Sequence, residues 1–271
     1  MGSYQGKRKL YRRAKELGVR MTVLDGPGHW VASAPDLFER VITVDLSEGA
    51  TLLEQSLAAI SASDEPFDAV ATFEEFAGPL AARIAHHLGL PGHNPHAVDL
   101  ARSKLRTREV CRAAGIPTPR FAPIASLADL EAAAGFVGFP AVLKPVAGAS
   151  SHAVYKVNTV AELRAAYAHN IAEARSGCAS AVTSDNEVAL IWGGSAEMVL
   201  EEFLNGEEFD VDCLLSGGKL VYAKLARDLP QPHMVETGMQ LPPNYPDDRQ
   251  DALVALAEQV LRTMGLLGAK T

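Results

Sequence analysis

The first 95 residues or so alternate short apolar runs with longer amphipathic stretches, and this alternation constrains the fold more than any other feature. Runs with the length and apolar content of buried strands stand at residues 20–25, 41–46 and 68–72. Stretches that we predict to be helical lie at residues 7–17, 51–62 and 76–88. Such alternation predicts a parallel sheet covered by helices, which binds ligands at the carboxyl ends of its strands.

The start of the chain departs from this pattern. A sheet of this type usually opens with an apolar strand, whereas residues 2–6 lead directly into the helix predicted at 7–17. We therefore expect the chain to begin just after the end of its first strand.

The second half contains shorter and more varied elements. After a turn-rich break at residues 91–95, we predict a helix over 96–114, which ends at the prolines of GIPTP. Further helices are predicted at 127–134, opened by Ser126 and Asp129, at 159–175, opened by a capping box of Thr159 and Glu162, and at 247–264. Strands are predicted at 121–123, 139–144, 153–157, 197–203, 208–215 and 219–225, the last three antiparallel. The chain is thus predicted to be α/β, with α+β character in its second half.

Composition narrows the classes of partner. Hydrophobic residues make up 48% of the 271, which suits about two domains with a sizeable core. No apolar run approaches the roughly 20 residues that span a bilayer, and the polar, basic N-terminus does not resemble a secretory signal. We therefore expect a cytoplasmic protein with no membrane partner. The net charge of -8 argues against nucleic acid, so phosphate groups would have to meet a few locally placed lysines.

The first chemistry-bearing stretch is residues 139–154, FPAVLKPVAGASSHAV. A predicted apolar strand ends at Lys144, the proline after it ends the strand pairing, and small residues follow at 147–151. Small residues let backbone N–H groups approach an anion, and a neighbouring lysine suits phosphate. The stretch matches neither common phosphate-loop fingerprint, so an ordinary hairpin loop with a lysine at its end is the alternative.

Two further stretches carry charges in suggestive positions. In residues 197–212, EMVLEEFLNGEEFDVD, a strand ends in two acids and an Asn-Gly turn leads to two more. A hinge of this kind could present a carboxylate to an adenine edge and another to ribose, although a solvated acidic hairpin has the same pattern. Residues 101–119, ARSKLRTREVCRAAGIPTP, place a lysine and several arginines on a helix, where each charge alone is explained by solvation.

In their order and spacing, the three stretches SKLRTREVCRAAGIPTP, FPAVLKPVAGASS and LEEFLNGEEFDVD resemble the ATP-grasp superfamily of carboxylate–amine ligases. The resemblance extends from residue 7 to residue 271. It implies an ATP-grasp fold with an N-terminal parallel-sheet domain, a small lid subdomain and an incomplete C-terminal antiparallel subdomain. The boundaries that we expect are 1–95, a connecting helix and turn at 96–120, 121–203 and 204–271.

The resemblance also implies roles at the phosphate end of a nucleotide site. Lys104 and Lys144 would contact the ATP phosphates and serve catalysis. The loop at 147–152, with Gly148, Ser150 and Ser151, would close over them. This assignment requires the two lysines, far apart in the chain, to converge on one triphosphate.

At the nucleoside end, Glu201 would accept the adenine amino group, and the backbone at Phe203 and Leu204 would read the ring. Glu208, the second acid after Gly206, would hold the ribose.

A narrower resemblance points to carnosine synthases and bacterial L-amino-acid ligases. Residues 24–48 look like their N-terminal segment, and residues 236–242, beginning at Glu236, look like the lining of their amino-acid pocket. Several bacterial members carry histidine where Met239 stands, which leaves the second substrate open. Independently of the resemblance, Glu74 and Glu75 follow the carboxyl end of a predicted strand and could hold a substrate ammonium, or lie in a solvated loop.

The implied activity is ATP-dependent joining of two amino acids through an acyl phosphate, with release of ADP and phosphate. ATP, Mg²⁺ and amino acids are the implied ligands, and a homo-oligomer is left open. In the family, a strand with a metal-binding glutamate and a Glu-x-Asn-x-Arg strand follow a Gly-Leu-Leu-like segment, whereas this chain ends at residues 265–271. We therefore expect the magnesium ligands beyond that end and no metal ligand within the chain.

Three other readings remain open at this point. The chain could be an ATP-grasp ligase of the purine-biosynthesis or carboxylase type, or a nucleotide-binding module without activity. A dinucleotide-binding protein should show a glycine fingerprint after its first strand, and the sequence shows none.

Overall fold

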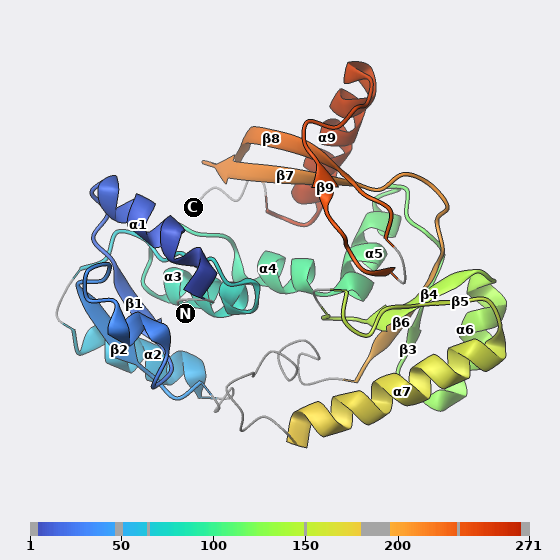
Figure 1. Ribbon diagram of the computed structural model, residues 1–271, viewed down its shortest axis with the longest axis horizontal. Helices are drawn as coiled ribbons and strands as arrows, with labels where there is room; N and C mark the ends of the chain where they lie inside the picture. Colours follow the sequence, from blue (N-terminus) through green and yellow to red (C-terminus); the bar gives the residue numbers. More distant parts are fainter. Residues whose placement is uncertain are drawn as a thin grey trace. The chain divides into compact units, whose positions relative to one another are not determined.

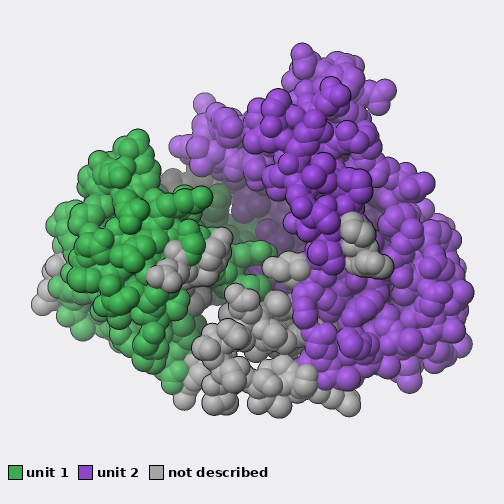
Figure 2. Space-filling view, in the orientation of Figure 1, with its two compact units in different colours: residues 1–98, 271 green, residues 99–270 purple. Residues whose placement is uncertain are grey.

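The computed structural model describes residues 5–46, 51–63, 66–148, 151–179, 196–231 and 234–266. Two compact units divide the chain, the first at residues 1–98 and the second at residues 99–270. Figure 2 colours the surface of each unit separately. The finer boundaries expected at residues 120 and 203 stay predictions.

The first unit contains a short parallel sheet. Strand β1 (Thr22–Asp25) pairs with β2 (Arg40–Thr43), so that Thr22 lies opposite Arg40. The helices of this unit are α1 (Arg8–Glu16), α2 (Leu52–Ser61) and α3 (Gly78–His87), all within the predicted helical stretches. Tyr11 of α1 packs edge-on against Phe38, with ring centroids 5.2 Å apart, in a hydrophobic core that also includes Val23 of β1. The alternation of strand and helix is therefore confirmed here.

One predicted strand is wrong. Residues 68–72 have no strand conformation and pair with neither β1 nor β2. Apolar and β-branched residues give a segment strand propensity, but a strand also needs free backbone groups on a neighbour. Strand propensity alone therefore predicted a strand here that the structure does not contain.

The second unit begins with a four-stranded antiparallel sheet in the order β3-β6-β4-β5. Its strands are β3 (Phe121–Ile124), β4 (Ala141–Pro145), β5 (Tyr155–Val157) and β6 (Met198–Glu202). Helices α6 (Leu130–Val137) and α7 (Val160–Ala179) pack on one face of this sheet (Figure 1). Leu143, Leu163 and Leu200 are fully buried in this part of the unit. The other face is left for the candidate site.

A second, three-stranded antiparallel sheet follows, in the order β7-β8-β9. It consists of β7 (Phe209–Ser216), β8 (Lys219–Asp228) and β9 (Met239–Gln240), with α9 (Asp247–Thr263) packed against β7 and β8. Gly217 and Gly218 make the β7–β8 turn with φ of 55° and 72°, a region that favours glycine. The antiparallel pairing of the last two predicted strands is confirmed, while β6 belongs to the other sheet.

The helix predicted over 96–114 is two helices, α4 (Pro95–Arg102) and α5 (Lys104–Ala113). Ser103 between them is extended, with φ of -99° and ψ of 104°, and its Oγ accepts from the N–H of Arg106 at 3.3 Å. A serine side chain offers the backbone this alternative to a continuous helix, and here it opens a new one. The break makes Lys104 the first residue of α5.

Two predicted helix starts can be compared with the structure. The capping box of Ser126 and Asp129 is present in both directions. Thr159 accepts from the N–H of Glu162 at 3.1 Å, but the Glu162 carboxylate accepts from the N–H of Asn158 instead of completing the box.

Across the part of the chain that the structure describes, no helix combines the length and the apolar character that a membrane crossing requires.

Candidate nucleotide-binding site

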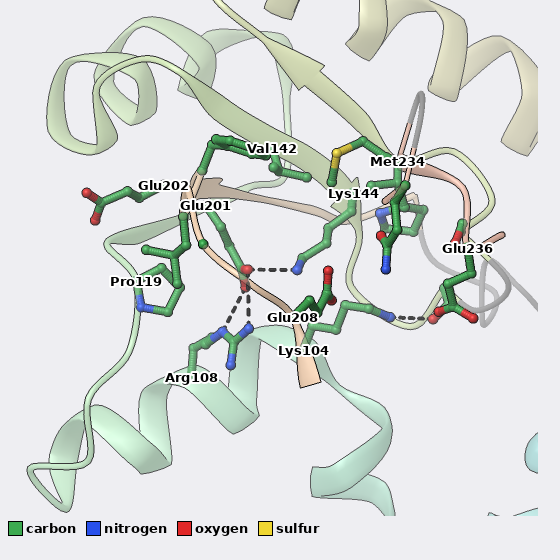
Figure 3. Close-up of a pocket in the computed structure, with 18 of the residues that line it drawn as sticks. Lys104, Arg108, Pro119, Val142, Lys144, Glu201, Glu202, Glu208, Met234 and Glu236 are labelled. Carbon is green, nitrogen blue, oxygen red and sulfur yellow. Dashed lines mark hydrogen bonds and ion pairs between the residues drawn. The ribbon is translucent and has the colours of Figure 1, made fainter. Parts of the chain in front are cut away.

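A pocket of about 480 Å³ lies within the second unit (Figure 3). Its walls come from α5, Pro119, β4 with the described part of the loop that follows it, the end of β6 with the hinge at residues 203–208, and Gln231, Met234 and Glu236. The pocket therefore joins the three stretches that the sequence singled out.

Lys104 and Lys144 both line this pocket. Along β4, Val142 and Lys144 line it while Leu143 between them is fully buried, because successive strand residues point to opposite faces. Lys104 arrives from α5, 40 positions earlier in the chain. The two lysines therefore share one pocket, while their convergence on a triphosphate stays a prediction.

Backbone contacts at the α4–α5 break hold Lys104 beside the loop after β4. Three successive carbonyls accept from this junction: Val146 from the N–H of Lys104 at 2.9 Å, Ala147 from Arg102 Nη2 at 3.0 Å, and Gly148 from Lys104 Nζ. The start of α5 is therefore fixed to the loop that the sequence predicts to cover phosphate.

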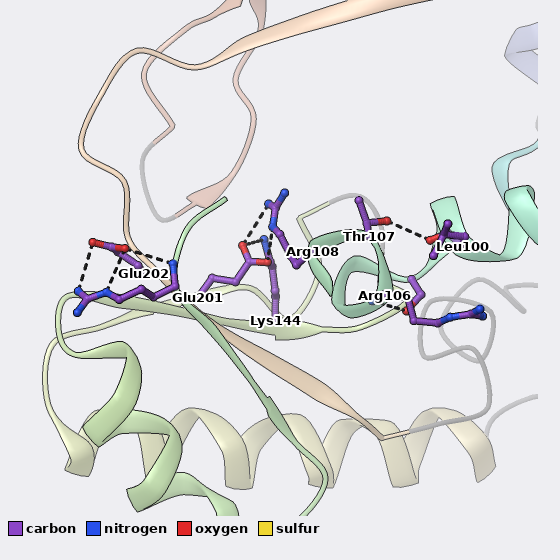
Figure 4. Close-up of polar contacts among 9 residues, drawn as sticks. Leu100, Arg106, Thr107, Arg108, Lys144, Glu201 and Glu202 are labelled. Carbon is purple, nitrogen blue, oxygen red and sulfur yellow. Dashed lines mark hydrogen bonds and ion pairs between the residues drawn. The ribbon is translucent and has the colours of Figure 1, made fainter. Parts of the chain in front are cut away.

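Glu201 lies at the base of the pocket and is only 4% exposed. Its carboxylate accepts from Lys144 Nζ at 2.7 Å and from Arg108 Nε at 3.0 Å and Nη2 at 3.3 Å (Figure 4). Burial raises the pKa of Glu201, but the charges and hydrogen bonds of Lys144 and Arg108 outweigh burial and hold that pKa below its usual value. Glu201 is therefore an ionised group that can only accept hydrogen bonds.

The hinge at residues 203–208 lines the pocket with Phe203, Leu204 and Glu208. The N–H of Phe203 already donates to the carbonyl of Pro140 at 3.1 Å, so this residue can offer only its carbonyl to a ligand. Burial, followed by the charges of Asp228, Asp210 and Glu236, raises the pKa of Glu208. The hinge end of the pocket is therefore acidic, opposite in character to the lysine end.

From the loop after β4, Gly148, Ser151 and His152 line the pocket. Ser150 lies outside the described residues, so its predicted role is untouched by the structure. Ser151 and Ala153 have φ of 55° and 58°, a conformation that costs non-glycine residues energy and needs support from its surroundings.

Helix α7 supplies that support. The fully buried Asn170 donates its Nδ2 to the carbonyl of Ala153 at 3.1 Å, and one turn later Glu173 contacts the His152 ring. The helix thus holds the loop from the face of the sheet opposite the pocket.

We expect Asn170→Ala to lower the free energy of unfolding by about 1–3 kcal/mol, because the buried carbonyl of Ala153 loses its donor. The loop should also be held less firmly, so that ATP affinity falls in the folded variant. Chemical denaturation and calorimetric titration check the two effects. Asn158→Ala, a change at an exposed asparagine, is the control; a stable Asn170→Ala with unchanged ATP affinity would contradict the bracing role.

The acids predicted to bind substrate fall in different places. Glu236 lines the pocket, and Figure 3 shows its carboxylate pointing toward the Lys104 side chain. Glu74 and Glu75 belong to the first unit, where Glu74 precedes the short 3-10 helix η3 (Glu75–Ala77), and they are not among the residues that line this pocket. Ammonium binding by Glu74 and Glu75 remains a prediction, as does a place for Glu236 in the amino-acid pocket.

No three histidine, cysteine, aspartate or glutamate side chains come close enough to hold a metal ion within the described ranges. Burial and the charges of neighbouring acids raise the pKa of Glu208 and that of Asp210, but these acids do not form such a group. We therefore assign no magnesium ligand among the described residues and no chemical step to a magnesium ion.

The pocket residues to which sequence reasoning assigned no role include Arg108, Gln231 and Met234. Arg108 is the instructive case, since on a helix it looks like any solvated charge. Its position four residues after Lys104 was the available signal, because residues i and i+4 share a helix face.

Comparison with known families decides the assignment. Residues 11–92 match the ATP-grasp N-terminal domain, and residues 137–269 match the ATP-grasp domain. The chain belongs to the ATP-grasp superfamily. Its fold is therefore the ATP-grasp fold, with an N-terminal parallel-sheet domain followed by antiparallel sheets, as the sequence predicts.

Individual relatives agree with this assignment. Carnosine synthase 1 of Gallus gallus is 31% identical over 267 residues, which cover 95% of this chain and 28% of that protein. A D-alanine–D-alanine ligase of Stutzerimonas stutzeri is 32% identical over 188 residues, 66% of this chain and 53% of that protein. The chain spans about a third of the length of the first curated relatives that it matches.

Among solved structures, the L-amino acid ligase from Bacillus licheniformis superposes with a TM-score of 0.66 at 24% identity, covering 95% of this chain and 57% of that one. At this identity the likeness concerns the fold. The narrower similarity to carnosine synthase and L-amino acid ligase extends over most of the chain but is weak. The resemblance stated from the sequence is to these same two proteins.

Proposed function

We propose that this chain provides the ATP-binding part of an ATP-dependent carboxylate–amine ligase that joins two amino acids. The observation that carries the proposal is the convergence of Lys104, Lys144 and the ionised Glu201 on one pocket of an ATP-grasp fold. Similarity to carnosine synthase 1 and to an L-amino acid ligase supports amino acids as the substrates.

The pocket has the polarity that ATP requires. Its phosphates would lie between Lys104 and Lys144, under the loop that includes Gly148 and Ser151, where two ammonium groups offset their charge. The adenine amino group would donate to Glu201, and the ribose hydroxyls would donate to Glu208. The two ends of ATP thus match the lysine end and the acidic end of the pocket.

The chemistry follows from the poor reactivity of a carboxylate. One carboxylate oxygen attacks the γ-phosphorus, the bond from that phosphorus to the bridging oxygen breaks, and ADP leaves. The amine nitrogen of the second amino acid then attacks the acyl phosphate carbon; phosphate leaves with the C–O electron pair, and the nitrogen loses a proton. Phosphoryl transfer needs positioning and charge neutralisation, which the two lysines would supply, and a closed loop would keep water from the acyl phosphate.

The full-length protein should release phosphate and ADP only when ATP and both amino acids are present. A phosphate-release screen against pairs of amino acids, including β-alanine with histidine, tests this in the presence of magnesium. Mass spectrometry of the product identifies the bond. Phosphate release that needs bicarbonate or a purine precursor and no amino acid would contradict the proposal, as would tight ATP binding without turnover on any amino-acid pair.

A further inference from the structure

Arg108 is held against Glu201 by two hydrogen bonds from one guanidinium group. Nε lies 3.0 Å from Oε1 and Nη2 lies 3.3 Å from Oε2 (Figure 4). The Arg108 side chain is 33% exposed, whereas that of Glu201 is 5% exposed. Such a planar two-point contact fixes the orientation of a carboxylate, which a single ammonium group does not.

The hydrogen-bonding capacity of Glu201 is almost filled. An ionised carboxylate has about four acceptor sites and no proton to donate. Arg108 and Lys144 together make three contacts with it, two of them at Oε2 and one at Oε1. Oε1 can therefore still accept a hydrogen bond, and a ligand that binds there must donate one from an N–H or O–H group.

This requirement distinguishes between purines. Adenine has an amino group at position 6, which can donate to Glu201. Hypoxanthine and guanine have a carbonyl at the same position, and its oxygen would face an ionised oxygen with no proton between them. Leaving buried polar groups unpaired is the most effective way in which a site rejects a close analogue.

Lys144 alone cannot maintain this state of Glu201. In the proposed function Lys144 serves the phosphates, so its contact with Glu201 is shared once ATP is bound. The residues opposite Glu201 on the neighbouring strands are Phe121 on β3 and Val142 on β4, neither of which is charged. Arg108 from α5 is therefore the cation that remains dedicated to Glu201.

We infer that Arg108 is a positioning residue that sets the nucleobase preference of the pocket, by keeping Glu201 an oriented acceptor for the 6-amino group of adenine. The inference rests on the proposed function for the orientation of the nucleotide, with its phosphates at Lys144 and its adenine at Glu201. Without Arg108, the buried carboxyl takes up a proton more readily and can then donate to a 6-carbonyl group as well as accept.

The test compares ATP with inosine triphosphate, which differs at position 6, by calorimetric titration of the same protein preparations. The wild type should prefer ATP at least about tenfold, the loss that accompanies one unpaired charged contact. Arg108→Met should reduce the preference to less than about threefold, while Arg108→Lys should retain part of it. Arg120→Met is the matched control. Arg120 pairs at 3.3 Å with Glu202, the residue that follows Glu201, and its side chain is exposed. This variant should leave the preference for ATP unchanged.

A second variant covers the case in which Arg108→Met does not fold. Arg108→Gln keeps hydrogen-bonding capacity without charge, and its ATP preference should fall as the pH is lowered, because Glu201 then protonates at a higher pH. The wild-type preference should stay constant over the same range, since Arg108 and Lys144 hold the pKa of Glu201 below its usual value. A purely structural role would lower both affinities together and leave their ratio unchanged.

The outcomes separate the two claims. If the wild type binds neither nucleotide, the proposed function fails. If the wild type prefers ATP and the folded Arg108 variants keep the full preference at every pH, the role of Arg108 is refuted while the proposed function stands.

Discussion

Replacing Lys144 by methionine should weaken ATP binding at least about tenfold. A charge-assisted contact is typically worth about 1.5–3 kcal/mol, and about 1.4 kcal/mol corresponds to a factor of ten in affinity. Lys144 lines the pocket and contacts Glu201 at 2.7 Å. Its loss therefore removes one of the two cations beside a buried carboxylate and, in the proposed function, a phosphate contact. Calorimetric titration and the KM for ATP in turnover measure the effect.

Lys219→Met is a suitable control for this variant. Lys219 is an exposed lysine at the start of β8 in the same unit, and it does not line the pocket. The control should bind ATP as the wild type does. A Lys144→Met protein that is folded and has unchanged ATP affinity and KM would remove Lys144 from the site.

Replacing Leu143 by alanine should lower the free energy of unfolding by about 2–5 kcal/mol, the range for deleting a buried leucine side chain. Leu143 is fully buried between two residues that line the pocket, and the strand turns its side chain to the opposite face. The folded variant should therefore keep its ATP affinity within about threefold. Urea denaturation at low temperature, with titration of the folded protein, measures both quantities.

Leu214→Ala provides the comparison, because Leu214 on β7 is 59% exposed and should tolerate truncation with a change of at most about 0.5 kcal/mol. The conclusion that Leu143 stabilises the core without contributing to the site would be wrong if Leu143→Ala were as stable as Leu214→Ala. It would be equally wrong if the folded Leu143→Ala protein lost most of its ATP affinity.

Much of the fold could be predicted from the sequence because local signals carry it. Apolar periodicity identified β1, β2 and the helices of the first unit, and the Ser126–Asp129 pair identified a helix start through contacts within three residues. Residues 68–72 show the limit of such signals, since propensity says nothing of whether a neighbouring strand is there to pair.

The site was predictable to the extent that its residues belong to a recognisable pattern. Lys104, Lys144, Glu201 and Glu208 were placed in one site by resemblance, and they line one pocket. The physical means of bringing them together was not predictable: the helix break at Ser103 and the carbonyl contacts that follow it join segments more than 40 residues apart. Arg108 was missed for the same reason, because its partner lies 93 positions along the chain.

The central claim is that Lys104 and Lys144 bind the same triphosphate, and a crystal structure with a non-hydrolysable ATP analogue tests it most directly. We predict that both lysine nitrogens lie within hydrogen-bonding distance of phosphate oxygens of one analogue molecule, with its adenine amino group donating to Glu201. An analogue bound outside this pocket, or one whose phosphates touch neither lysine, would contradict the account.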